Sequence, residues 1–210
     1  MVELDCVQAN TRYPGEYASL KDFITPHHLM VKDLASTFTG DEREIVFAMW
    51  KWVGERIRYP EMSNGYEYRR LEAFTERGFF SVRPAVVLQS QGDFWDYPTE
   101  VLSMRISDCD GTAFLLTSLL LNQLPPERVF AAIGNINIGS PQGHAWVEVE
   151  IDGSWYVLES TKKNFNKARF ISIHEASEYN AVYRFNSDKI YMVSDELVLS
   201  KCRPCCPLWI

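Results

Sequence analysis

The sequence has no excess of positive charge and no long apolar run, and each shortage excludes a class of protein. Its 21 Lys and Arg against 28 Asp and Glu give a net charge of −7. A surface that neutralises nucleic-acid phosphates needs clustered Lys and Arg, so we expect no nucleic-acid partner. The longest apolar run is interrupted by Thr117, Ser118 and Asn122. It falls short of the roughly 18 residues of a membrane span, so we expect no membrane partner.

We also expect neither a secretory signal nor a disulfide framework. Its first residues, MVELDCVQAN, do not follow the basic-then-apolar order of a signal peptide, so we expect a cytoplasmic protein. Its 5 cysteines are an odd number, and three of them crowd together as Cys202, Cys205 and Cys206. Such spacing favours reduced thiols. A structural zinc site needs four ligands, and only Cys6 or His174 could complete one here, so we expect no metal and no cofactor.

A chain of 210 residues fits a single globular domain over residues 1–210. Residues 1–40 contain many helix and strand breakers, which predicts an N-terminal arm with one short helix near 27–34. We expect the core over 41–161 and a C-terminal extension over 162–210. The oligomeric state is not predicted.

Hydrophobic spacing predicts helices first and strands later. Apolar residues recur at helical intervals after Asp41, and a second helix, apolar on nearly every side, runs from about Gly111 to Asn122. Alternating patterns then predict strands, with a tight turn at Asp152-Gly153 between the second and third of them. These strands are expected at 129–138, 144–151, 154–159, 170–173 and 190–193. This order predicts an α+β fold in which the apolar helix packs on an antiparallel sheet.

Cys109 lies at the predicted start of the apolar helix, between Asp108 and Asp110. The exposed N–H groups and the dipole of a helix start stabilise a thiolate, which is the nucleophilic form of cysteine. The two aspartates act in the opposite direction, because like charge disfavours a second anion. A thiolate here therefore calls for a cationic partner, and histidine is the obvious candidate.

His144 is the best placed of the 4 histidines, because it begins a predicted strand. Counting back from the Asp152-Gly153 turn pairs Ile151 with Ser154. That register brings Glu159 within diagonal reach of His144. A carboxylate at this position can accept a hydrogen bond from one ring nitrogen and so orient the imidazole toward a thiol.

Three ordered motifs carry a family resemblance: DCDGTA at 108–113, GHAWV at 143–147 and WYVLEST at 155–161. Together with the upstream segment DFWDYPTEVL at 93–102, they resemble the transglutaminase-like superfamily, particularly its small bacterial and phage-type members related to cysteine peptidases. The resemblance covers roughly residues 41–161. It differs at Glu159, where Asp is more frequent, and at Ser107, where Gly is common.

The resemblance implies a papain-like α+β core and a catalytic triad of Cys109 as nucleophile, His144 as base and Glu159 as orienting acid. The implied reaction is acyl transfer through a thioester, on a protein or peptide amide substrate, with water or an amine as acceptor. The backbone N–H of Cys109 is one expected oxyanion donor, and Gln91, Gln89 and Trp95 are candidates for the second. Two alternatives remain open: a non-catalytic member of the fold that binds peptide or protein, and a phage structural or assembly module.

Overall fold

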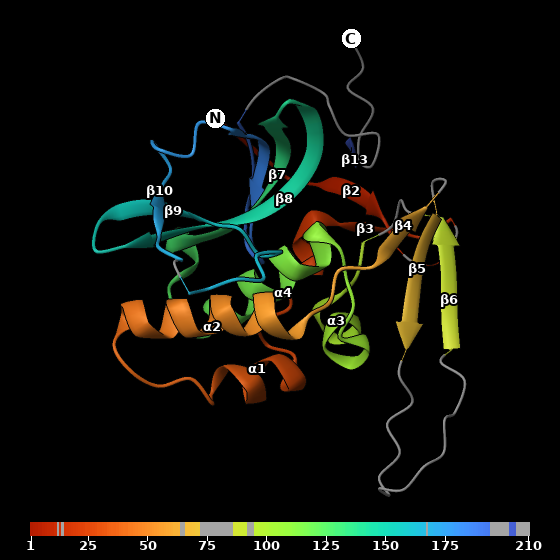
Figure 1. Cartoon of the computed structure of the whole chain (residues 1–210). Helices are drawn as coiled ribbons and strands as arrows, with labels where there is room; N and C mark the ends of the chain where they lie inside the picture. Colours follow the sequence, from red (N-terminus) through yellow and green to blue (C-terminus); the bar gives the residue numbers. More distant parts are fainter. Residues whose placement is uncertain are drawn as a thin grey trace, which may run out of the picture.

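The chain folds as one central antiparallel sheet with helices on one side (Figure 1). The computed structural model describes residues 1–11, 13, 15–63, 66–71, 86–91, 95–166, 168–193 and 202–204. The central sheet has seven strands, in the spatial order β1 (Val2–Leu4), β12 (Ile190–Met192), β11 (Tyr179–Phe185), β7 (Val129–Ile138), β8 (Ser140–Ile151), β9 (Ser154–Leu158) and β10 (Ile171–Ser172). The predicted α+β class is confirmed.

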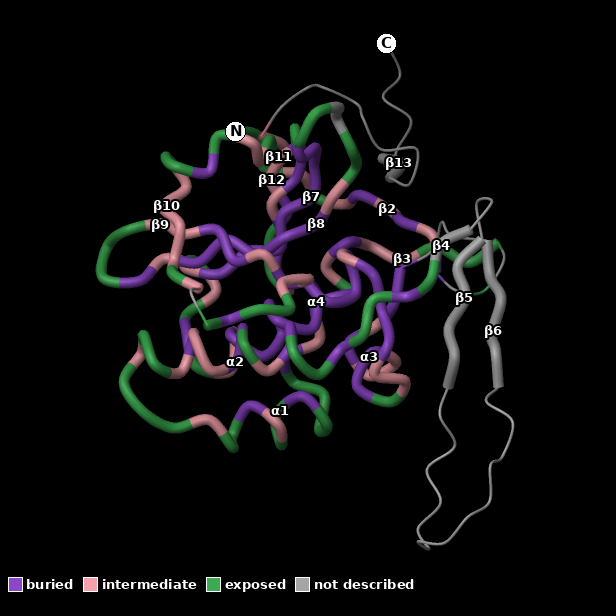
Figure 2. The backbone as a smooth tube through the Cα atoms, viewed as in Figure 1, coloured by how far each residue is buried: buried purple, intermediate pink, exposed green. Residues whose placement is uncertain are grey.

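The described residues form four α-helices beside the sheet: α1 (Leu29–Ala35), α2 (Glu42–Arg56), α3 (Pro98–Met104) and α4 (Cys109–Leu120). Helix α4 lies between the sheet and the other helices, since it contacts β7 and β8 on one side and α1, α2 and α3 on the others. From Asp110 to Leu120 every α4 residue is buried (Figure 2). A helix that is apolar around its whole circumference has to be surrounded in this way, because no face of it could meet water without cost.

Helix α2 begins at a capping box. The Asp41 carboxylate accepts the Glu44 N–H at 2.9 Å, and the Glu44 carboxylate accepts the Asp41 N–H at 3.0 Å. These bonds satisfy N–H groups that have no partner within the helix. They fix the entry to the helix that carries Trp50.

The β8–β9 hairpin has the predicted register. Ile151 pairs with Ser154 and Val147 pairs with Leu158. Asp152 and Gly153 have φ angles of 52° and 74°, the left-handed region that a two-residue hairpin turn requires at both positions. The turn therefore sets which residues face each other at the far end of the hairpin, where the candidate site lies.

Shorter elements complete the fold. The described residues form two further sheets of three strands each. One consists of β13 (Cys202–Pro204), β2 (Val7–Asn10) and β3 (Tyr17–Ser19). The other consists of β4 (Glu61–Ser63), β5 (Tyr66–Leu71) and β6 (Val86–Gln91). The part of the chain that the structure describes also has two 3-10 turns, η1 (Leu20–Phe23) and η2 (Pro126–Arg128). Among the helices of the described ranges, none has the length and apolarity to cross a membrane.

Two predictions need correction. The core does not stop at residue 161, because β11 lies between β7 and β12 in the central sheet and β1 joins the same sheet at its edge. The thiols are not all reduced, because Cys6 is disulfide-bonded. Sequence spacing gave no indication of this bond, since 5 cysteines in no regular pattern do not identify a pair.

Candidate active site

Cys109 is the first residue of α4 and is partly buried against the core. Its thiol is not part of a disulfide. Asp108 occupies the N-cap position, but its side chain makes no capping hydrogen bond. The helix start therefore keeps N–H groups that no side-chain cap from Asp108 satisfies, and such groups favour negative charge beside them.

The segment before Cys109 is held by a buried pair of polar side chains. The Ser107 hydroxyl donates to the Asp96 carboxylate at 2.6 Å, and both residues are fully buried. Gly111 packs directly over this pair, since a Cβ at that position would come within 2.1 Å of the Ser107 oxygen. The glycine is thus required by close approach, and the contact fixes the first turn of α4 relative to the preceding loop.

A second contact joins the first turn of α4 to the end of strand β9. The Thr112 hydroxyl lies 3.0 Å from the Cys109 carbonyl oxygen and 2.9 Å from the Ser160 hydroxyl. Ser160 directly follows Glu159 and is fully buried. Two hydroxyl groups therefore connect the residue that begins α4 to the neighbour of the candidate acid.

His144 and Glu159 are hydrogen-bonded to each other, as the hairpin register predicts. The distance between His144 Nε2 and Glu159 Oε2 is 2.7 Å. The exposed fractions of the two side chains are 15% and 24%. The His144 ring stacks on Trp146 at 6.3 Å between centroids. The imidazole is therefore held by a hydrogen bond at one nitrogen and by an aromatic contact on its face.

The Glu159 carboxylate accepts three further hydrogen bonds. Thr161 donates to it from both its backbone N–H and its hydroxyl, and the Tyr179 hydroxyl donates to Oε2 at 3.0 Å. Burial alone would raise the pKa of Glu159, but the contacts with His144 and Thr161 outweigh it and lower that pKa to about 2. Glu159 is accordingly a carboxylate at neutral pH.

An ionised Glu159 determines the tautomer of His144. A carboxylate only accepts hydrogen bonds, so the proton of the shared bond resides on Nε2 of the imidazole. In the neutral ring Nδ1 then carries the lone pair. This arrangement suits a base that takes a proton from a thiol at Nδ1 while its Nε2–H stays bonded to the acid.

The backbone of Glu159 is anchored as well. Trp50, on α2, donates its indole N–H to the Glu159 carbonyl oxygen at 2.8 Å. The pKa of Tyr179 is raised, first by burial and then by the adjacent Glu159 charge. Tyr179 therefore stays protonated and remains a donor to the acid.

Of the three residues predicted as the second oxyanion donor, the structure describes the surroundings of Trp95 but not the side chains of Gln89 and Gln91. Trp95 is buried against Phe23 and Phe114, and its backbone N–H donates to the Asn10 carbonyl at 3.0 Å. That N–H is therefore already engaged. Gln89 and Gln91 lie on β6, but their side chains fall outside the described residues, so their role stays a prediction.

Sequence reasoning missed Tyr179, Thr112 and Trp50 as partners of this site. Tyr179 comes from β11, a strand that the alternation in the sequence did not reveal. Thr112 and Trp50 belong to predicted helices, but their contacts span 48 and 109 residues of sequence. Within the described ranges, no group of three or more His, Cys, Asp and Glu side chains is placed to hold a metal ion.

Comparison with known proteins identifies the family. A model of the transglutaminase-like domain matches residues 30–190. Solved structures similar to this one include LapG of Legionella pneumophila in an EGTA-treated form, at 13% identity and a TM-score of 0.46, over 79% of this chain and 84% of that chain. The calcium-bound form of LapG is similar at 14% identity and a TM-score of 0.44, over 81% of this chain and 92% of that chain.

A candidate cysteine protease from Cytophaga hutchinsonii is similar at 13% identity and a TM-score of 0.38, over 94% of this chain and 54% of that chain. The search of curated proteins finds no match. Because the domain model spans most of the sequence, the chain belongs to the transglutaminase-like domain family. The resemblance drawn from the three motifs is confirmed at this level.

Proposed function

We propose that this protein is an enzyme that transfers acyl groups from protein or peptide amide bonds, as a cysteine peptidase or amidase or as a protein-glutamine transglutaminase. In this proposal Cys109 is the nucleophile, His144 the general base and acid, and Glu159 the group that orients His144. The observation that carries the proposal is the 2.7 Å hydrogen bond between His144 Nε2 and Glu159. It prepares Nδ1 as the proton acceptor.

The proposed reaction begins when Nδ1 takes the proton of the Cys109 thiol. The sulfur attacks the amide carbon, and the carbonyl electrons move onto oxygen to form an oxyanion beside the start of α4. The oxyanion then collapses, the C–N bond breaks, and the amine leaves with the proton held on His144. A thioester remains on Cys109. Water or a second amine attacks it, with His144 again accepting the proton and returning it to sulfur.

The electrostatics of the site fit this sequence. Glu159 carries a full negative charge next to the ring that becomes cationic. This charge stabilises the imidazolium form of His144, and so favours the ion pair of thiolate and imidazolium. Asp108 and Asp110 disfavour the thiolate, while the helix start favours it. The N–H groups at the start of α4 are the nearest candidates to receive the oxyanion.

A Cys109→Ala variant tests the proposal. Release of ammonia or amine from glutaminyl and other amide-containing peptides should fall to the background rate, because no other group in the proposal forms the thioester. A fluorescent primary amine added to the same reaction separates the two outcomes, since incorporation of the amine indicates transfer and its exclusion indicates hydrolysis. Full activity in the Cys109→Ala variant would contradict the proposal.

A further inference from the structure

A buried carboxylate, Glu148, lies four residues after His144 on the same strand. Residues of a strand alternate between its two faces. Ala145, Val147 and Val149 belong to the main core that includes α4, whereas Trp146 packs in a separate cluster with Ala132 and Val157. Glu148 therefore points to the side of the sheet away from α4. The proposed reaction does not use it.

Glu148 is paired with Arg184 of β11. Arg184 Nε lies 2.5 Å from Glu148 Oε2, and Arg184 Nη2 lies 3.2 Å from Oε1. Trp146 donates its indole N–H to the same Oε1, at 3.2 Å. The Glu148 side chain is only 3% exposed, but that of Arg184 is 26% exposed. The charge pair thus has a buried acid and a guanidinium that reaches the surface.

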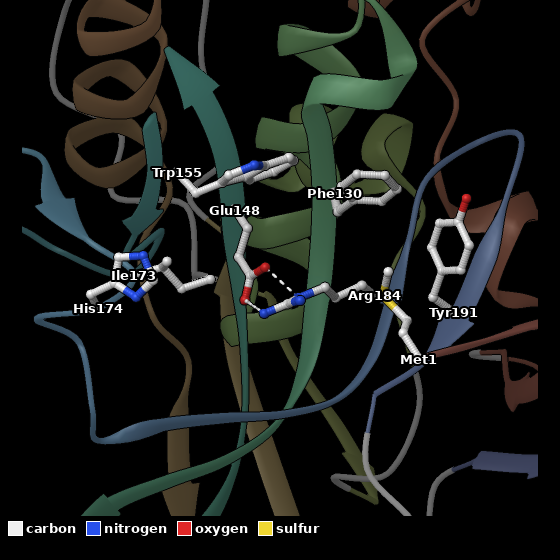
Figure 3. A pocket seen from close by; sticks show the side chains of 8 residues that line it. All are labelled: Met1, Phe130, Glu148, Trp155, Ile173, His174, Arg184 and Tyr191. Atoms are coloured by element: carbon white, nitrogen blue, oxygen red, sulfur yellow. Dashed lines mark hydrogen bonds and ion pairs between the residues drawn. The ribbon is translucent and has the colours of Figure 1, made fainter. Parts of the chain in front are cut away.

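A pocket of about 520 Å³ opens over this pair (Figure 3). This volume falls within the range of about 300–1,000 Å³ that is typical of small-molecule sites. Aromatic rings form much of the wall, with Phe130 at 5.9 Å from Trp155 and at 5.9 Å from Tyr191, between centroids. The remaining lining residues are Met1, Ile173 and His174.

The polar groups of the pocket leave donors available to a ligand. Arg184 uses Nε and Nη2 toward Glu148, and among the described residues Nη1 has no hydrogen-bond partner. The Glu148 carboxylate already accepts hydrogen bonds from Trp146 and Arg184. Lys189, a second cation, lies close to the lining residue Tyr191 and also close to Glu3, which offsets part of its charge. Planar guanidinium groups bind carboxylates particularly well.

We propose that this pocket binds a small carboxylate with an aromatic body. The carboxylate would accept hydrogen bonds from Arg184 Nη1, and the ring would pack among Phe130, Trp155 and Tyr191. A buried ion pair by itself is weak evidence for any role. The combination of the pocket's volume, its aromatic walls and a guanidinium edge that has no partner among the described residues carries the assignment. The lining of the pocket does not include Cys109, His144 or Glu159, so ligand binding can be measured independently of the acyl-transfer reaction.

Isothermal titration with 3-phenylpropionate tests the proposal at millimolar concentrations. Three matched compounds isolate each requirement: 3-phenylpropanol keeps the ring without the charge, phenethylamine reverses the charge, and acetate keeps the charge without the ring. We expect 3-phenylpropionate to bind about tenfold more tightly than the alcohol, because a hydrogen bond between a guanidinium and a carboxylate is roughly twice as strong as one to a neutral hydroxyl. Equal binding of the alcohol or the amine, or no binding of 3-phenylpropionate, would overturn the assignment.

Two variants locate the binding. Glu148→Gln combined with Arg184→Gln neutralises the pair without leaving either charge alone, and it should abolish the preference for the carboxylate. Ile173→Trp fills the pocket without touching the pair, and it should abolish binding even if the double variant does not fold. Arg169→Gln, at an exposed arginine paired with Glu175, is the control and should bind as the wild type does. Retained binding in Ile173→Trp would place the ligand elsewhere and refute the proposal.

Discussion

Two carboxylates of neighbouring strands, Glu148 on β8 and Glu159 just after β9, have pKa values shifted in opposite directions. Burial is the largest influence on both and acts to raise the pKa in each case. The pKa of Glu159 nevertheless falls to about 2, whereas that of Glu148 rises. Both have a basic side chain as partner, so the sign of the charge nearby does not explain the difference.

The number and quality of the hydrogen bonds explain it. Glu159 accepts bonds from His144, from Thr161 twice and from Tyr179, at distances of 2.5–3.0 Å. Glu148 accepts one bond from Trp146 and one from Arg184, both at 3.2 Å. Its other contact with Arg184, at 2.5 Å from Nε, is an ion pair but does not form a hydrogen bond. A carboxylate with several short donors is stabilised as an anion despite burial. Glu159 is consequently suited to hold a charge during a reaction, and Glu148 is suited to a structural or ligand-binding role.

The largest expected effect follows from Glu159→Gln. An amide at this position can donate to Nε2 of His144, which would move the imidazole proton to Nδ1 and remove the base. We expect kcat/KM on an amide substrate to fall by about 10²–10⁴, since the wrong histidine tautomer in a serine protease triad costs about 10⁴. Steady-state kinetics would measure the change.

Glu148→Gln is the matched control for that variant. It makes the same chemical change at a buried carboxylate outside the proposed triad. Activity per folded molecule should stay close to that of the wild type. If both variants lose activity equally, the opposite pKa shifts of the two carboxylates do not distinguish a catalytic residue from a non-catalytic one.

A large effect on stability is expected from Arg184→Met. Glu148 would remain buried without its cation, and breaking one partner of a buried pair typically costs about 3–5 kcal/mol. Urea unfolding should show this loss. Adding Glu148→Leu to the same chain should recover most of it, because an apolar pair replaces the ion pair without leaving a lone charge. A double variant that is no more stable than Arg184→Met would contradict this account of the pair.

The pH dependence of stability should distinguish the carboxylates at a more modest level. The folded pKa of Glu159 lies below its ordinary value of 4.5, at about 2. Its contribution to stability is therefore complete above pH 4.5 and is lost as the pH falls toward 2. Glu159→Gln should flatten the acid limb of the stability profile over this window, as measured by urea unfolding at a series of pH values. An unchanged acid limb would mean that the folded pKa of Glu159 is not lowered.

The smallest effect is expected from Tyr179→Phe. Loss of this donor leaves Glu159 bonded to His144 and Thr161, so the pKa of Glu159 should rise and the free energy of unfolding should fall by about 1 kcal/mol. The acid limb of the kcat/KM profile should move to higher pH, a shift that a merely structural tyrosine would not produce. Tyr17→Phe, at an exposed tyrosine, is the control. An unshifted profile in Tyr179→Phe would exclude this role.

Much of the site was accessible from the sequence because it depends on local geometry. A two-residue turn at Asp152-Gly153 fixes the register of β8 and β9, and the register alone brings Glu159 to His144. The helix that begins at Cys109 follows from an apolar run after a polar edge. Periodicity and turn chemistry act over a few residues, so they can be read without a structure.

Contacts between distant segments were not accessible. Tyr179 reaches Glu159 from β11, and β11 pairs with β7 across a bulge between Ala181 and Tyr183. Such an irregularity breaks the two-residue alternation that would have revealed the strand. The disulfide of Cys6 and the pairing of Glu148 with Arg184 likewise depend on the tertiary fold. Composition and spacing carry no signal for them.

The central claim is that Cys109 reacts as a thiolate supported by His144. The direct measurement is the pH dependence of iodoacetamide alkylation at Cys109, mapped by mass spectrometry, in the wild type, in His144→Ala and in the control His174→Ala. We predict alkylation with a midpoint well below the pH of roughly 8.5 at which an ordinary thiol ionises, retained in His174→Ala and lost in His144→Ala. Alkylation of Cys109 with the midpoint of an ordinary thiol in all three proteins would contradict the claim.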